Sequence, residues 1–107
     1  MSTGCVTLYV TSPAGDVPER LARTLVEERL VACVNVLPAG LSHYSWGGEM
    51  QVDEEVVLFC KTTEALAERA TARLVQLHPY EVPCVLQLPL LGGHAPYLEW
   101  LRERVSG

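Results

Sequence analysis

The sequence predicts an α+β fold, a βαββαβ sandwich followed by an extra C-terminal helix, with an antiparallel sheet carrying helices on one face. Two observations lead to it: segments that alternate apolar and polar residues are separated by segments with helical periodicity, and a glycine pair divides one long β-rich stretch into a hairpin. With 107 residues, the chain has the usual size of one domain, so we expect a single domain over residues 1–107.

The first strand and helix are predicted from periodicity. Residues 5–11 place Val6, Leu8 and Val10 on one face, as in a half-buried strand. Asp16 is a candidate N-cap for a helix that runs to about Arg29. Its apolar stripe consists of Val17, Leu21, Leu25, Ala22 and Val26.

A long hairpin is predicted for residues 31–62, with Gly47-Gly48 as its turn. This turn places Trp46 opposite Glu49, and Tyr44 opposite Gln51. Sixteen residues at about 3.3 Å each span roughly 50 Å, whereas a compact domain of this size is about 34 Å across. Part of the hairpin should therefore protrude, unless it curls at residues 38–40 to cover its own domain.

The protruding end of the hairpin predicts self-association. A monomer would leave Tyr44 and Trp46 exposed, and one aromatic side chain buries about 150 to 250 Å². We therefore expect a homo-oligomer with Tyr44 and Trp46 at its interface.

The remaining elements follow in order. Thr63 can cap a second helix, which must end before Pro79. Residues 82–89 form a short strand whose prolines place it at an edge of the sheet or mark its ends. Pro96 opens the last helix.

Composition and charge limit the classes of partner and the compartments that we expect for this protein. A net charge of -5 disfavours phosphate backbones, so we expect no nucleic-acid binding. No apolar run is long enough to cross a membrane, and residues 1–4 have no signal-peptide character, which leads us to expect a cytoplasmic protein. The four cysteines form no Cys-x-x-Cys pair, so disulfides are not expected.

Four residues have open interpretations. Cys33 is either a small core residue or a soft metal ligand, and His78 is either a helix-end cap or a ligand. Lys61 either reaches the rim of the fold or binds an anion. Glu55 points to the same face as Lys61 but lies about 20 Å away along one strand, so each needs other partners. We find no catalytic motif and expect no enzyme.

Several segments together resemble the CutA divalent-cation tolerance family. They are residues 25–38, Ser42, Tyr44, Trp46, Gly48, Lys61-Thr62-Thr63, His78-Pro79-Tyr80, Val82-Pro83, Tyr97-Leu98 and Trp100. The resemblance implies a ferredoxin-like fold and a homotrimer held by the long hairpin, similar to PII-type signalling trimers. It connects Cys33 and His78 with metal binding, of copper or another divalent cation. It assigns Glu55, Lys61, Tyr80 and Trp100 to a ligand cleft.

Two positions depart from the family pattern. Cys84 stands where Glu is usual, and His94 replaces an Asn or Asp that would cap the last helix. Both could add soft ligands, but they stay outside the main hypothesis.

Two functional hypotheses follow. The first is a trimeric, non-enzymatic protein of metal-ion tolerance and homeostasis that binds copper or another divalent cation. The second is a PII-like signalling module that binds a small anionic ligand in a cleft between subunits. An RNA-binding domain with the same strand order is disfavoured, because the chain is acidic and lacks the aromatic strand motif.

Overall fold

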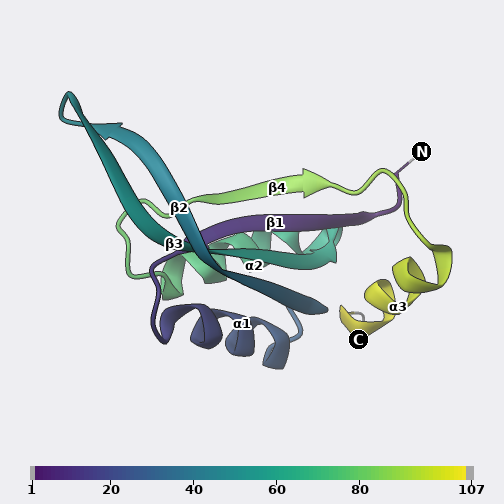
Figure 1. Ribbon diagram of the computed structural model, residues 1–107. Helices are drawn as coiled ribbons and strands as arrows, with labels where there is room; N and C mark the ends of the chain where they lie inside the picture. Colours follow the sequence, from purple (N-terminus) through teal and green to yellow (C-terminus); the bar gives the residue numbers. More distant parts are fainter. Residues whose placement is uncertain (1, 106–107) are drawn as a thin grey trace.

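The computed structural model describes residues 2–105 and has the predicted order of strands and helices. The elements are β1 (Cys5–Ser12), α1 (Val17–Glu27), β2 (Cys33–Trp46), β3 (Glu49–Thr63), α2 (Glu64–Leu77), β4 (Val85–Pro89) and α3 (Ala95–Val105). The sheet is antiparallel, in the order β2-β3-β1-β4 (Figure 1). The predicted α+β class is confirmed, and β4 is an edge strand.

The main core lies between the sheet and the pair α1 and α2, which contact each other on one face of it. Leu8 and Val10 of β1 are fully enclosed there. They pack with α1 and α2 through Leu21, Leu25, Ala70 and Leu74, all fully buried. The apolar face of β1 and the apolar stripes of the two helices therefore pack against each other, as the sequence predicts.

The helix boundaries match the predictions within two residues, although the caps differ. Asp16 precedes α1 but makes no capping hydrogen bond, and its carboxylate instead lies 3.5 Å from the Arg20 guanidinium. The α1 helix ends at Glu27 because the chain reverses at Arg29, whose φ is +57°. His78 ends α2 in an extended conformation, as expected for a residue before proline.

The opposite face of the sheet is partly covered by α3. Leu101 and Val105 of this helix pack on Cys5 and Ala32 in a second, smaller core. As a result, β1 is largely buried on both faces, rather than half-buried as predicted. Beyond α3, this face stays open, and we call it the open face. Tyr9 and Phe59 meet edge to face there, with ring centroids 5.7 Å apart.

The hairpin of β2 and β3 has the predicted register, with Trp46 opposite Glu49 and Tyr44 opposite Gln51. Its distal half rises from the body of the molecule as an arm (Figure 1), and the longest dimension is 45 Å. The arm leaves Trp46 75% and Met50 73% exposed. The hairpin therefore protrudes, as the strand lengths predict. No helix within residues 2–105 is both long and apolar enough to span a bilayer.

The base of the arm contains an irregularity that predicts a large change in stability at one residue and a small one at its neighbour. The register shifts between Leu37 and Gly40, and Ala39 has a φ of +65°. A Cβ at Gly40 would lie 2.8 Å from the Glu55 carbonyl oxygen, so Gly40→Ala should destabilise the fold by about 1 to 3 kcal/mol. Ala39→Gly, the matched control, relieves left-handed strain and should change stability by less than about 1 kcal/mol.

Guanidinium-induced unfolding of the two variants checks this pair. Equal stability of Gly40→Ala and the parent chain would show that the strand moves away at this point.

Candidate functional site

A groove of about 650 Å³ runs between the arm and the segment that follows α2. The arm contributes Tyr44, Trp46, Gln51, Asp53 and Glu55, the segment contributes Tyr80, Glu81, Val82 and Cys84, and β1 contributes Thr11. The three carboxyl groups and the absence of any Lys or Arg among these lining residues make the groove acidic. We call it the acidic groove.

Two tyrosines are hydrogen-bonded to the carboxylates of this groove. The Tyr44 hydroxyl donates to Asp53, and this bond, followed by burial, raises the pKa of Tyr44 above its ordinary value. The Tyr80 hydroxyl donates to Glu55 at 3.3 Å. Burial is the main cause of the raised pKa of Tyr80, and the Glu55 charge comes second. Both phenols therefore stay protonated and act as donors at neutral pH.

His78 is hydrogen-bonded to two residues that line the acidic groove, Thr11 and Tyr80. Its buried ring places Nε2 2.8 Å from the Thr11 carbonyl oxygen, and Nδ1 accepts the Tyr80 backbone N–H at 3.1 Å. A carbonyl can only accept, so Nε2 donates to Thr11, and Nδ1 is the acceptor for the Tyr80 N–H. Both ring nitrogens are engaged, and the ring contacts Tyr80 at 4.8 Å between centroids.

A second cluster lies near the start of β2, under α3. Cys33 and Lys61 stand opposite each other in the β2-β3 ladder. The Tyr97 hydroxyl lies 3.5 Å from Cys33 Sγ and 3.2 Å from Lys61 Nζ. Trp100 follows one turn later, with its ring centroid 5.5 Å from that of Tyr97. We call these four residues the lysine cluster.

The predicted cleft residues fall into these two places. Glu55 and Tyr80 are hydrogen-bonded in the acidic groove, where Tyr44 and Trp46 also lie. Lys61 and Trp100 belong to the lysine cluster. One chain does not bring the two halves together.

The two predicted metal ligands also lie apart within one chain. Cys33 is level with Thr7 of β1, whereas His78 binds Thr11, four residues further along that strand. This offset alone is about 13 Å along the strands, and Cys33 also lies two strands away from β1. Among residues 2–105, no three His, Cys, Asp or Glu side chains form a group that could hold a metal ion.

Sequence reasoning gave no site role to Tyr97, Asp53 or Thr11. The predicted register puts Asp53 on the face of Tyr44, which was a usable signal for the groove. Tyr97 precedes Trp100 by one helical turn, so the two predict a shared face, but only the docking of α3 places it beside Lys61. The contact of Thr11 with His78 has no local signal.

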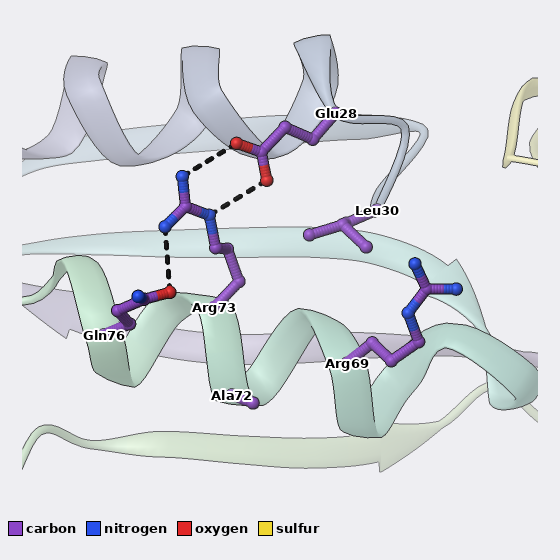
Figure 2. A pocket seen from close by; sticks show the side chains of 6 residues that line it. All are labelled: Glu28, Leu30, Arg69, Ala72, Arg73 and Gln76. Atoms are coloured by element: carbon purple, nitrogen blue, oxygen red, sulfur yellow. Dashed lines mark hydrogen bonds and ion pairs between the residues drawn. The ribbon is translucent and has the colours of Figure 1, made fainter.

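A further hollow, of about 460 Å³, lies on the helical layer between α1 and α2. Figure 2 shows Arg73 reaching from α2 to both carboxylate oxygens of Glu28 and to Gln76, with Arg69 to one side. The Arg73 hydrogen bonds hold the pKa of Glu28 below its ordinary value. The Arg73 guanidinium is already bound to Glu28 and Gln76 within the chain. We therefore interpret this hollow as the place where the two helices are linked by an ion pair, and not as a binding site.

Comparisons with known proteins agree closely with one another. The family described as "CutA1 divalent ion tolerance protein" matches residues 6–104. The "Divalent-cation tolerance protein CutA" of Thermus thermophilus is 45% identical over 99 residues, covering 92% of this chain and 96% of that protein. Human "Protein CutA" is 42% identical over 95 residues, covering 89% of this chain and 53% of that protein. The chain thus spans about half the length of the human relative.

Solved structures give the same result. The crystal structure of CutA from Xylella fastidiosa superposes with a TM-score of 0.94 at 33% identity, covering 96% of this chain and 99% of that one. The periplasmic divalent cation tolerance protein CutA from Archaeoglobus fulgidus superposes with a TM-score of 0.91 at 29% identity, covering 95% and 99%.

Proposed function

Because the chain belongs to the CutA1 divalent ion tolerance family, we propose that it acts in metal-ion tolerance as a non-enzymatic homotrimer that binds copper or another divalent cation. The observation that carries this proposal is the family match over residues 6–104, with a fold that superposes along nearly its whole length. The family name concerns tolerance to divalent ions. The proposal adds three things to the family name: copper as a bound metal, the trimeric state and the residues that bind.

Two exposed apolar surfaces support assembly. Leu37, Leu86 and Leu88 of the open face are 46%, 54% and 41% exposed, beside Tyr9 and Phe59. The arm adds Tyr44, Trp46, Met50 and Val52, all exposed in one chain. Surfaces of this kind mark interfaces between proteins. We propose that the open face lies inside the trimer and that Tyr44 and Trp46 contact a neighbouring subunit.

Assembly would also complete the cleft. The acidic groove contains Glu55 and Tyr80, and the lysine cluster contains Lys61 and Trp100, so neither half has all four predicted residues. The acidic groove and the lysine cluster have opposite charges and lie at different ends of the sheet. We propose that each cleft joins the acidic groove of one subunit to the lysine cluster of the next.

The proposed metal ligands are Cys33 and His78. A thiolate with an imidazole suits copper in its reduced state. Since the two are offset by about 13 Å along the strands alone, they would have to come from two subunits, and His78 would have to release one of its hydrogen bonds. Cys84, which lines the acidic groove, is the alternative thiol.

The second candidate function is a PII-like signalling module. It is favoured by the Lys61 ammonium, which lies beside the Tyr97 hydroxyl and 5.3 Å from the centre of its ring. A small anionic ligand would bind there, against Trp100 and the neighbouring subunit's half of the cleft.

We propose the cytoplasm as the compartment, and the four free cysteines fit its reducing conditions. Relatives described as chloroplastic and periplasmic occur in the family.

Competition titration of Cu(I) against a chromophoric chelator tests the metal proposal. Cys33→Ala and His78→Gln should each weaken Cu(I) binding about tenfold or more, the size expected for loss of one interaction that orients or supplies a ligand. Cys84→Ala is the comparison variant, because Cys84 is the other half-buried thiol and the alternative ligand. It should bind copper like the parent chain if Cys33 supplies the thiolate.

Undiminished copper binding by the Cys33 and His78 variants would reject these ligands. Absence of copper binding, together with thermal stabilisation by a small anion that Lys61→Met abolishes, would favour the signalling module instead.

A further inference from the structure

The acidic groove has the size and the lining of a site for a small organic molecule. Its volume of about 650 Å³ lies within the usual range for such sites. Tyr44, Trp46 and Tyr80 line it, and all three rings are partly exposed. The face of an aromatic ring attracts positive charge, as do the three carboxyl groups of the groove. The lining therefore favours a cation that also has an apolar part.

Thr11 adds an unpaired hydroxyl to this groove. Its backbone N–H donates to the Cys84 carbonyl, and its own carbonyl is bound by His78. Its side chain is nine-tenths buried, yet the hydroxyl has no hydrogen-bond partner within residues 2–105. In that range only Thr7 has an unpaired side-chain oxygen that is also sealed from solvent, so the Thr11 hydroxyl is open to the groove that Thr11 lines. A buried hydroxyl of this kind is usually satisfied by water or a ligand.

The carboxylates of the groove have room for further donors. Asp53 and Glu55 each accept one tyrosine hydroxyl, from Tyr44 and Tyr80. A carboxylate offers about four acceptor positions, so most of them stay open. The hydrogens of both tyrosines are already used in these bonds. The groove thus presents mainly acceptors, and a ligand that satisfies them must bring N–H or O–H donors.

The spacing of these acceptors suits an elongated organic cation. Asp53 and Glu55 lie on the same face of β3, about 7 Å apart along the strand. Thr11 stands opposite Val57 and is therefore the diagonal neighbour of Glu55 on that face. A metal ion needs oxygens that converge to about 2.0 to 2.6 Å, and the described part of the chain, residues 2–105, holds no such group of three side chains. Two ammonium groups at the ends of a four-carbon chain are roughly 6 Å apart, which matches the spacing of the carboxylates.

We propose that the acidic groove binds a small organic diamine. One ammonium group donates to Glu55 and to the Thr11 hydroxyl, and the other donates to Asp53. The methylene chain between them lies against the aromatic rings of the groove. All these groups belong to one chain. The inference goes beyond tolerance to metal ions, since it uses neither a metal nor the proposed copper ligands.

Calorimetric titration of the metal-free, full-length protein with putrescine, a four-carbon diamine, measures this binding. Putrescine should release heat on binding and should raise the melting temperature of the protein. The permethylated analogue of putrescine keeps the chain and both charges but has no N–H donor. It should bind at least about tenfold more weakly, because the charge-assisted hydrogen bonds are lost.

Three variants locate the site. Glu55→Gln should weaken putrescine binding about tenfold, and Thr11→Val, which keeps the shape of the side chain, about threefold. Glu54→Gln is the matched control, because it removes the same charge from the next residue of β3, on the opposite face beside Leu41. It should bind putrescine like the parent chain. Circular dichroism without ligand checks that all three variants are folded.

Any of three results would overturn the proposal. The first is neither heat of binding nor thermal stabilisation with millimolar putrescine. The second is equal affinity for putrescine and its permethylated analogue. The third is an equal loss of affinity in Glu54→Gln and Glu55→Gln, which would mean that only the overall charge of the chain attracts the diamine.

Discussion

Phe59→Glu should convert the proposed trimer into a monomer. Phe59 lies in a cross-strand row with Tyr9 and Leu86 on the open face. If that face is the subunit interface, each subunit would bury a carboxylate among apolar side chains, at a cost of several kcal/mol per charge. Light scattering should give three times the chain mass of 11.8 kDa for the parent protein and a single chain mass for the variant.

Two further variants keep this test decisive. Leu86→Glu changes a 54% exposed residue on the edge strand of the same row and should also give a monomer, even if Phe59→Glu folds poorly. Val75→Glu, at a 46% exposed position on α2, is the matched control and should remain trimeric. A trimer that survives both open-face substitutions would place the interface elsewhere.

Alkaline pH should destabilise the fold through Cys60. Burial, with a smaller contribution from Cys33, raises the pKa of the Cys60 thiol from its ordinary value of 9.0 to about 12. Because the folded pKa is the higher one, the stabilisation is complete below pH 9 and is lost as the pH rises toward 12. The full difference corresponds to about 4 kcal/mol.

Urea unfolding between pH 8 and pH 11 measures this effect. Cys60→Ala should be less stable at pH 8, since it leaves a small cavity, but its stability should fall less steeply with pH. The raised pKa values of Tyr44 and Tyr80 act in the same direction in both proteins, so they do not change the comparison. Equal slopes for the two proteins would mean that Cys60 does not titrate as a buried thiol.

Local patterns in the sequence were sufficient to predict an antiparallel sheet and the register of its long hairpin. Strand side chains alternate with a period of two, so the Gly47-Gly48 turn determines which residues face each other along the arm. The helices followed because apolar stripes such as Leu21 and Leu25 must face a core. The burial of β1 on both faces was missed, since it depends on where α3 packs after the chain has folded.

The candidate site was predictable only in part, for a related reason. Glu55 and Tyr80 were assigned to one cleft with Lys61 and Trp100 through the family resemblance, and the chain holds them as two pairs. Periodicity gives the face of a residue but not its neighbours in other elements. The contacts of Tyr97 with Lys61, and of His78 with Thr11, arise from tertiary packing and have no sequence signal.

The irregularity near Gly40 has a consequence for newly made chains that have not yet met a partner. The strand β2 is an edge strand, so one side of its backbone offers unpaired amide and carbonyl groups. Open edges of this kind invite strands of other molecules to stack in amyloid-like fashion. Pro38 lacks an amide hydrogen, and the register shift between Leu37 and Gly40 divides the edge into two shorter stretches. The irregularity at the base of the arm therefore also protects unassembled chains against aggregation.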